Sequence, residues 1–588
     1  MIELSQTHDL AIIATDVGRS IGGDGSTFFR GTAISYARGL LAFGASGWAE
    51  AQSRLGKDAD GLEGEFIAVQ WDTRSVRVTR DVFGNASLLH TSGEGYLAIS
   101  DSMLVLKQLR VAMGSPCSLN HESMLARTIK SSLAGQQISP ETAIEQIRFV
   151  PAGQGLVASF SADSLKVTNS GPPISQRLDI GRIDYRDSIR QGAANVGRLL
   201  SALQQVEGWN TALSLSGGYD SRVVLAGAAA VGAIPNMTFS NWKLSEVHND
   251  DYVVARALAE RFGFNLHGVR SATDGGPLAP PTRVQRDYTQ FALWGASLMG
   301  KYDGIAREML FRRSEFSLTG IGAELLKGNW KWRTWDEVCN ALDVQPAILD
   351  AFRRQGVKGL EAIDADPGAQ DASELHYLGY RNGLHGSAGH VPVHMTGVHP
   401  VQQLGLAALG HATESNVVRR GRGARARATT SDSRRVRDRS RPIGDPRAVN
   451  DLAILLSPEV AVEPYDTPGR NLLPSYVDLR LRTLGGRISA SEMSTLTLFG
   501  DPASVPTGPS ELSIALSRDC GYDVELSVEN ILAVGDAGVD LLEDGFLRTT
   551  YAELAENARW RLVTRGQDLI SGGSSAAKVA SLAALAAA

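Results

Sequence analysis

The order of apolar and polar residues divides the chain into two parts. Residues 64–91 read GEFIAVQWDTRSVRVTRDVFGNASLLHT, in which short alternating runs are separated by the turn-forming pairs Asp-Thr and Gly-Asn. Alternation with a period of two is typical of half-buried strands, so this stretch predicts a meander of antiparallel strands. Residues 1 to about 170 are therefore expected to be rich in β-structure. A stretch rich in Ser, Gly and Pro at 161–181 predicts a linker.

From about residue 183 the pattern changes to helices that alternate with buried strands. Apolar residues at intervals of three and four predict an amphipathic helix over 184–206. Strands are expected at 211–216 and 236–240, and helices at 222–232 and 250–264, the last of these ending at Gly263. Strand, helix, strand and helix in so short a stretch imply a parallel sheet with crossover helices.

Composition and charge limit the class of protein. Of the 588 residues, 43% are hydrophobic and 21% are charged, which is typical of globular proteins with large cores. The length allows up to four domains of ordinary size, and two large ones fit equally well. A net charge of −6 and a pI near 6 provide no general attraction to nucleic acid or to anionic membranes.

The cysteines and the hydropathy indicate a cytoplasmic protein. Cys117, Cys339 and Cys520 follow neither a metal-binding nor a disulfide spacing, which fits a reducing compartment. The first residues, MIELSQTHDLAIIATDV, lack a basic region, and their apolar run is too short for a signal sequence. No stretch reaches the 18 or so apolar residues that a membrane span requires.

Two later segments differ from the rest of the chain. Residues 419–441 hold ten arginines against two aspartates, Asp432 and Asp438. A solvated loop, a phosphate-binding region and a contact for an acidic partner or peptide all fit that composition. Residues 566–588 form a low-complexity tail, for which a frayed helix and a disordered end are both open.

The stretch SGGYDS at 216–221 is the strongest candidate for chemistry. It lies between a predicted strand and a predicted helix, where Gly217 and Gly218 let backbone N–H groups converge on a phosphate. Asp220 would repel a phosphate directly but fits if Mg²⁺ lies between the two. A Ser/Gly turn capped by an aspartate explains this hexapeptide alone equally well.

Four further stretches relate this one to a known superfamily. SGGYDS resembles the pyrophosphate loop of ATP pyrophosphatases, and of asparagine synthetases in particular. LTGIGAELLKGNW at 318–330 resembles the second motif of that family, and DYVVARALAERFG at 251–263 resembles its D-x-x-x-A-x-x-x-A helix. Residues 62–91 and IRFVPAG at 147–153 resemble its glutamine amidotransferase domain.

The resemblance implies an α/β protein of two domains. Residues 1–170 would form a degenerate glutamine amidotransferase-type domain of the Ntn-hydrolase-like α+β class. Residues 183–565 would form an ATP pyrophosphatase (PP-loop) domain with a parallel sheet and many helices, and 566–588 the tail.

The resemblance also implies a set of site residues. ATP would be bound by Ser216, Gly217, Gly218, Tyr219, Asp220 and Ser221, with Phe239, Ser240 and Gly320 near the adenosine. Mg²⁺ would be held by Asp220 and Glu324. The catalytic residues would be Asp220, Glu324, Lys327 and Glu374, with Lys331 as a further phosphate contact.

The sequence departs from this family at three places. A working glutaminase uses a cysteine as residue 2, whereas Ile2 stands here and the first cysteine is Cys117, so we expect no glutamine hydrolysis. Ile321 replaces the glutamate or tyrosine that serves as a base in relatives. Glu374, His376 and Tyr377 lie in the zone of further family site residues, although a surface helix face explains them too.

The third departure is a missing lysine. No lysine occurs between Lys358 and Lys578, whereas family members use one in this region to stabilise the leaving pyrophosphate. An arginine from 419–441 is one candidate to replace it, since a guanidinium binds phosphate oxygens in a bidentate manner.

These features favour an ATP-dependent ligase that forms an amide through an acyl-adenylate and releases AMP and pyrophosphate. The amine would come from the substrate, as in β-lactam synthetases and in the macrolactam cyclases of lasso peptides, the latter being the leading subtype. Partners would be a peptide or small carboxylate substrate, together with a leader-binding protein or peptidase, but neither nucleic acid nor a membrane. An asparagine synthetase-like enzyme using free ammonia and a catalytically silent scaffold are the alternatives.

Overall fold

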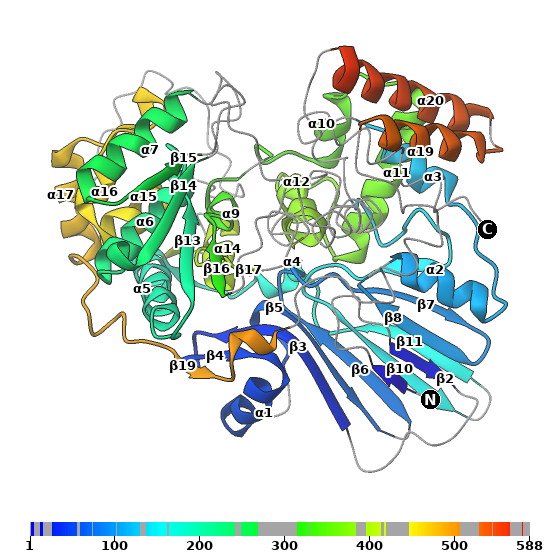
Figure 1. Cartoon of the computed structure of the whole chain (residues 1–588), viewed down its shortest axis with the longest axis horizontal. Helices are drawn as coiled ribbons and strands as arrows, with labels where there is room; N and C mark the ends of the chain where they lie inside the picture. The colour runs from blue at the N-terminus through cyan, green and yellow to red at the C-terminus, as the bar shows by residue number, and fades with distance from the viewer. Residues whose placement is uncertain are drawn as a thin grey trace.

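The computed structural model describes residues 2–4, 12–15, 26–55, 59–72, 74–101, 103–129, 137–161, 164–241, 249–268, 314–328, 330–383, 395–412, 417–418, 446–505, 528–543, 545–564 and 579. Within these ranges the protein is a mixed α/β structure. Figure 1 shows antiparallel sheets from the first part of the chain, in blue and cyan, and a separate green sheet surrounded by helices.

The first part contains two antiparallel sheets. The larger sheet has the order β11 (Ser164–Ser170), β10 (Gly155–Ser161), β6 (Ser75–Arg80), β5 (Glu63–Trp71), β3 (Ser26–Ser35), β4 (Leu40–Phe43) and β19 (Thr497–Phe499). The smaller sheet has the order β1 (Ile2–Leu4), β2 (Ile12–Thr15), β8 (Tyr96–Ser100), β7 (Leu89–Gly93) and β9 (Ile147–Phe149). Neighbouring strands are antiparallel except β19, which runs parallel to β4.

Alternating side chains hold these two sheets in a layered arrangement. On β5, Ile67 and Val69 share a buried cluster with Leu97 and Ile99 of the smaller sheet. The residues between them face the other way, so that Phe66 packs with α1 (Gly44–Leu55) in a separate cluster. Helix α2 (Met103–Ala112) covers the outer side of β7 and β8. The order is therefore helix, sheet, sheet and helix.

The second part is built around a five-stranded parallel sheet. Its order is β15 (Leu266–Gly268), β14 (Met237–Asn241), β13 (Asn210–Ser214), β16 (Glu315–Leu318) and β17 (Met395–Val398). The chain runs outward from β13 through β14 to β15, and then continues on the other side of β13 with β16 and β17. The order of strands thus reverses between β13 and β16. Open parallel sheets bind ligands beyond the carboxyl ends of the strands at such a point.

Helices pack around this sheet as the apolar periodicity requires. Helix α5 (Tyr185–Leu203) precedes β13, α6 (Tyr219–Ala230) follows it, and α7 (Asn249–Phe262) follows β14. Helix α15 (Pro446–Leu456) packs against both α5 and α6 with an almost wholly buried surface. Gly263 has a φ of +71° and its N–H donates to the Ala259 carbonyl at 2.9 Å, which confirms the predicted end of α7.

Three local predictions differ from the structure. The predicted linker at 161–181 contains β11, which pairs with β10, and the short helix α4 (Ile174–Arg177). The predicted meander is split between sheets, because β5 and β6 pair in the larger sheet while β7 joins the smaller one. The helix after β13 also begins at Tyr219, earlier than the sequence indicated.

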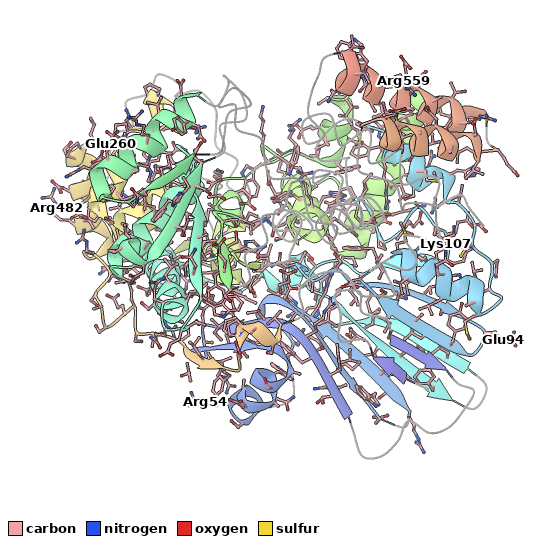
Figure 2. All side chains as sticks on the ribbon, in the orientation of Figure 1. Arg54, Glu94, Lys107, Glu260, Arg482 and Arg559 are labelled. Atoms are coloured by element: carbon pink, nitrogen blue, oxygen red, sulfur yellow. The ribbon has the colours of Figure 1, made fainter. Side chains whose placement is uncertain are left out.

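The C-terminal half returns twice to the first part of the molecule. Strand β19 extends the larger sheet beside β4, and the guanidinium of Arg54 donates to Thr497 at 3.2 Å and lies over Phe499 (Figure 2). Helix α20 (Gly545–Arg559) lies near α3 (His121–Ala126), and the Tyr551 hydroxyl donates to the Met124 carbonyl at 3.3 Å (Figure 1). The two parts are therefore joined at several places along the chain.

Some sequence predictions fall outside the described residues. These are the arginine-rich segment 419–441, the tail 566–588 apart from Val579, and Cys520. Cys117 and Cys339 lie within the described ranges as free thiols. Among the helices that the structure describes, none combines the length and the apolar character needed to cross a membrane.

A buried carboxylate joins the larger antiparallel sheet to the second part. The Oε1 atom of Glu63 on β5 accepts the backbone N–H of Leu404 at 2.8 Å, at the start of α14 (Leu404–His411). Its Oε2 atom is buried and has no hydrogen-bond partner among the described residues. Burial raises the pKa of Glu63 to about 8, although the bond from Leu404 acts in the opposite direction.

The stability of the protein should therefore depend on the protonation of Glu63. The pKa of Glu63 is raised above the ordinary 4.5. Its contribution to the free energy of unfolding is therefore complete below pH 4.5 and is lost as the pH rises through about 8. We expect Glu63→Gln to lose less thermal stability than the wild type between about pH 5 and about pH 8.5, measured as the unfolding midpoint. Glu50→Gln, at an exposed position of α1, is the control and should follow the wild type. If the unfolding midpoints of Glu63→Gln and the wild type changed with pH in parallel, the raised pKa of Glu63 would be contradicted.

Candidate functional site

The loop after β13 is folded back onto the start of α6 by two serines. The backbone N–H of Ser216 donates to the Ser221 hydroxyl at 2.9 Å, and the two hydroxyls lie 3.0 Å apart. Gly218 is the N-cap residue of α6 and provides no side-chain cap for its first-turn N–H groups. The start of this helix is therefore left to bind another acceptor.

Two residues from neighbouring elements hold this loop in place. Asp251 in the first turn of α7 accepts the backbone N–H of Gly217 at 2.6 Å. Asn241 at the end of β14 donates to the Leu215 carbonyl at 2.7 Å. The acidic residue of the D-x-x-x-A helix motif therefore binds the loop itself, and the N–H of Gly217 is already used.

The loop after β16 reaches the same place because two glycines allow close contacts. A Cβ atom on Gly320 would lie 2.3 Å from the Asp220 carbonyl carbon and 2.6 Å from the Ser221 nitrogen. Gly322 has a φ of +103°, and a Cβ there would lie 2.3 Å from the Gln402 nitrogen. Side chains at these positions would separate the two loops, so glycine is required at both.

Glu324 is a buried carboxylate that accepts hydrogen bonds from three protein donors. It lies in α9 (Ala323–Lys327), and its Oε2 atom accepts the Gly322 N–H at 2.8 Å. Its Oε1 atom accepts the Tyr377 hydroxyl at 3.0 Å and the Asn382 side-chain amide at 2.8 Å. Burial, and then the nearby charge of Asp220, raise the pKa of Glu324 to about 7.

Lys327 joins the two loops by an ion pair. Its Nζ atom donates to both carboxylate oxygens of Asp220, at 2.7 and 2.9 Å, and lies 6.0 Å from the centre of the Tyr219 ring. The Asp220 and Lys327 side chains are 38% and 24% exposed, so the pair faces solvent on one side. The structure thus brings Asp220, Glu324 and Lys327 together, as the motif spacing indicated.

The predicted adenosine-binding residues lie on the strand beside the loop. Phe239 is fully buried and packs against Phe264, with ring centres 4.0 Å apart. The Ser240 carbonyl accepts the Leu215 N–H at 2.8 Å. The side chain of Phe239 is thus part of the core, and a role for the main chain here stays a prediction.

Glu374 is placed differently from Asp220 and Glu324. It lies in α12 (Ala372–His376), and its buried carboxylate accepts the backbone N–H groups of Trp330 at 2.5 Å and Trp332 at 3.4 Å. These bonds fix the turn that follows α9. A catalytic role for Glu374 stays a prediction, whereas its hydrogen bonds to Trp330 and Trp332 position the loop behind Glu324.

The neighbours of Glu374 also separate into different roles. His376 is fully buried, its Nε2 atom lies 2.7 Å from the Ile138 carbonyl, and burial lowers its pKa to about 4. It is therefore a neutral core residue. Tyr377 contacts the site through its hydroxyl bond to Glu324. Lys331 has a φ of +67° and an exposed side chain, and no hydrogen bond or ion pair is described for it.

Sequence reasoning missed the segment 460–470, which forms one wall of the loop. The buried guanidinium of Arg222 donates to the carbonyls of Val460, Glu463 and Pro464 at 2.8–3.2 Å. It also lies 4.3 Å from the centre of the Tyr465 ring. Arg222 directly follows SGGYDS, but nothing in the sequence identifies partners some 240 residues away.

This wall places a cation and an anion beside the loop. The Asp466 N–H donates to the Gly217 carbonyl at 3.1 Å, and Arg470 donates to the Asp466 carboxylate at 3.1 Å. The Arg470 guanidinium also lies 5.0 Å from the centre of the Tyr219 ring, and it is 42% exposed. Arg470 therefore lies beside the predicted phosphate loop through its contact with Tyr219.

A histidine also lies at the carboxyl edge of the sheet. The Nδ1 atom of His399, directly after β17, lies 2.7 Å from the Thr319 hydroxyl, which in turn accepts the Ile321 N–H at 3.3 Å. His399 thus stands near the position where the sequence lacks a base. It was not singled out because a single histidine in an apolar stretch gives no motif.

The donors at this site fit Mg²⁺ bound together with a nucleotide. No cluster of three or more histidine, cysteine, aspartate or glutamate side chains suited to a metal occurs among the described residues. Magnesium bound with phosphates, however, uses only one or two protein carboxylates, which Asp220 and Glu324 provide. Asp220 would then share its oxygens between the metal and Lys327.

Comparison with known proteins adds a weak structural similarity. No protein-family model matches the chain, and no curated protein matches it in sequence. One similar solved structure is the glutamine phosphoribosylpyrophosphate (PRPP) amidotransferase from B. subtilis in complex with ADP and GMP. The identity is 12% and the TM-score 0.15, with 60% of this chain and 61% of that chain covered. The matched region thus spans about three fifths of that enzyme, and the site is argued from its geometry alone.

The close contact of the two loops can be tested with one added methyl group. We expect Gly320→Ala to lower the unfolding midpoint by several degrees, because its Cβ would overlap backbone atoms of Asp220 and Ser221, and such overpacking costs about 1–3 kcal/mol. Gly405→Ala is the control, since a Cβ there meets nothing within 4 Å. Equal midpoints for the two variants in differential scanning calorimetry would show that the loops are not in contact.

Proposed function

We propose that the protein is an ATP-dependent carbon–nitrogen ligase that forms an amide through an acyl-adenylate. One observation carries this proposal. Asp220 and Glu324 lie in the first turns of α6 and α9, the helices that follow the neighbouring parallel strands β13 and β16. They lie near each other where the order of the strands reverses, beside a glycine loop and the start of the twelve-residue helix α6. An anion-binding helix start with two carboxylates suits a magnesium–polyphosphate substrate.

The proposed fold assignment follows from the same features. The first part would be a glutamine amidotransferase-type domain and the second a PP-loop domain, with the division near 170–183 expected from the sequence. Support comes from the four layers of helix, sheet, sheet and helix in the first part, and from the strand order of the second.

ATP would lie with its phosphates at the start of α6. The first-turn N–H groups of this helix have no side-chain cap, and Gly218 leaves space beside them. Asp220 and Glu324 would hold Mg²⁺, which when bound neutralises charge on the departing pyrophosphate. Lys327 and Arg470 would add positive charge at the same end of the sheet.

The reaction would proceed in two substitutions. A substrate carboxylate oxygen bonds to the α-phosphorus of ATP, and pyrophosphate leaves. An amine nitrogen then bonds to the activated carbonyl carbon, AMP leaves, and the amine proton passes to a base or to water. His399, which contacts the loop that carries Ile321 through Thr319, would be the candidate to accept that proton.

The amine would come from the substrate, and the leading subtype is closure of a macrolactam ring in a lasso-type peptide. Residues 1–116 contain no cysteine, so they offer no thiol for glutamine hydrolysis. The substrate would be a peptide or a small carboxylate, and a leader-binding protein or peptidase would assist with a leader-bearing peptide. An asparagine synthetase-like enzyme using ammonia is the alternative within the same chemistry.

The first test is Mg²⁺-dependent release of AMP and pyrophosphate from ATP across a panel of peptides and amino-acid carboxylates. We expect Asp220→Asn to abolish this release, since it removes one of the two carboxylates beside the loop. Asp250→Asn, at an exposed position in the first turn of α7, is the control. Unchanged turnover in Asp220→Asn would remove its role in metal binding. Release of glutamate from glutamine would contradict a substrate amine, and failure of the wild type to bind ATP would favour the scaffold.

A second test concerns the missing lysine. We expect Arg470→Ala to lower kcat for AMP formation by about 10²-fold, because it removes a cation beside the phosphate loop, and Arg470→Lys to restore part of it. Arg482→Ala is the control, since Figure 2 shows Arg482 at the outer edge of the molecule. A kcat for Arg470→Ala within a factor of two of the wild type would contradict this role for Arg470. The arginines of 419–441 would then be the candidates to replace the lysine.

A further inference from the structure

A chain of side-chain amides connects the first part of the molecule to Glu324. The Asn382 amide donates to Glu324 Oε1 at 2.8 Å, and Gln402 donates to the Asn382 oxygen at 2.7 Å. Asn85, on the loop that follows β6, donates to the Gln402 oxygen at 2.7 Å and accepts from its nitrogen at 3.3 Å. Three successive amides therefore lie between the antiparallel sheets and the candidate metal site.

Each amide in this chain is fixed by its neighbours. Asn85, Gln402 and Asn382 are 1%, 5% and 0% exposed, so an unpaired polar atom in any of them would cost free energy. Asn85 is itself held from the first part, since its backbone N–H donates to Asp81 at 2.9 Å and its side chain donates to the Gly64 carbonyl at 2.9 Å. The chain of amides therefore begins at a residue that the first part of the molecule holds in place.

The direction of the amides matters for Glu324. The side-chain oxygen of Asn382 already accepts a hydrogen bond from Gln402. The Asn382 nitrogen is therefore the atom that faces Glu324. If Asn382 turned over, it would present an oxygen to a carboxylate oxygen, and the two would repel. Asn85 fixes Gln402 in the same way, since it both donates to Gln402 and accepts from it.

Backbone packing supports the same connection. The Gln402 nitrogen lies against Gly322, where a Cβ would come within 2.3 Å, and the Gly322 N–H donates to the other oxygen of Glu324. Gln402 therefore helps to position both oxygens of Glu324. It bonds to Asn382, which bonds to one oxygen, and it packs against Gly322, whose N–H bonds to the other. Its position in turn depends on Asn85 and on the bond from Leu404 to Glu63.

We propose that Asn85, Gln402 and Asn382 form a positioning relay through which the first part of the protein holds Glu324 in its metal-binding orientation. The inference rests on the proposed function and extends it, because it assigns the first part a role in the ATP site. The three amides are positioning residues, and none of them touches the reacting atoms. Outer partners of metal ligands commonly affect metal affinity by 10–100-fold when they are removed.

The experiment measures magnesium-dependent ATP binding by isothermal titration calorimetry in the full-length protein. We expect Asn382→Leu to raise the Kd of MgATP by about 10–100-fold, and Asn85→Leu, from the first part, by about 10-fold. The matched control is Gln355→Leu, which removes a buried amide that joins the two parts elsewhere, through Ser139, Glu122 and Glu141. It should change the Kd by less than about twofold.

A double-mutant cycle separates a relay from general loosening. In the Asn382→Leu background, Asn85→Leu should add almost nothing, because the chain is already broken between Asn85 and Glu324. Additive effects of the two variants, or equal effects of Asn85→Leu and Gln355→Leu, would overturn the proposal. If Asn85→Leu does not fold, Asn85→Ser and Gln402→Met interrupt the same chain with smaller changes.

A second readout is independent of ATP. Hydrogen exchange of the peptide 319–328, without nucleotide, should be faster in Asn85→Leu but not in Gln355→Leu, since the Gly322 N–H bonds to Glu324. Unchanged exchange would overturn the relay even if ATP binds. If the wild type does not bind MgATP while exchange responds as expected, the proposed function fails and the connection to Glu324 stands.

Discussion

The structure of the site depends on holding two carboxylates beside each other. Asp220 and Glu324 repel one another, and the burial of Glu324 adds the cost of removing its charge from water, so its pKa rises to about 7. Lys327 offsets this cost at Asp220, and Tyr377, Asn382 and the Gly322 N–H offset it at Glu324. Removing these acids from water costs free energy that the surrounding donors only partly offset. Apolar contacts in place of the charged groups would stabilise the fold more. Under the proposed function, a bound cation would offset the repulsion between the two acids.

The antiparallel part of the molecule is firmly attached to this site. Glu63 binds the start of α14, Asn85 binds Gln402, and β19 and α20 return from the C-terminal half to pack on it. The contacts at Glu63 and Asn85 converge on residues 402–404, between the parallel sheet and α14. The first part of the molecule thus holds the turn that carries Gln402 in place.

Local patterns in the sequence predicted the elements that carry the loops, but not the contacts that hold them. The strand, glycine turn and helix at 211–232 follow from spacing alone, and the motif at 318–330 indicated Glu324 and Lys327. Arg222, Asn382 and Gln402 have partners between 20 and about 320 residues away, and periodicity carries no information on such pairs. The Ser, Gly and Pro residues of 161–181 predict a linker, although Leu165 and Val167 within it alternate and pack on the sheet core. Glu374 was selected by its position along the chain, whereas its carboxylate binds backbone N–H groups.

The balance of charge at the loop indicates which form of nucleotide it suits. Asp220 and Glu324 face one ammonium group, Lys327, and Arg470 is already paired with Asp466. Asp251, which binds the N–H of Gly217, adds a third carboxylate, so with all three acids ionised two negative charges are in excess. Under the proposed function, free ATP, itself strongly negative, would be repelled at short range. Under the proposed function, a divalent cation would offset that excess, so the same residues that disfavour bare polyphosphate would favour its magnesium complex. Burial and the charge of Asp220 raise the pKa of Glu324, and under the proposed function a bound cation would stabilise the charge of this buried acid.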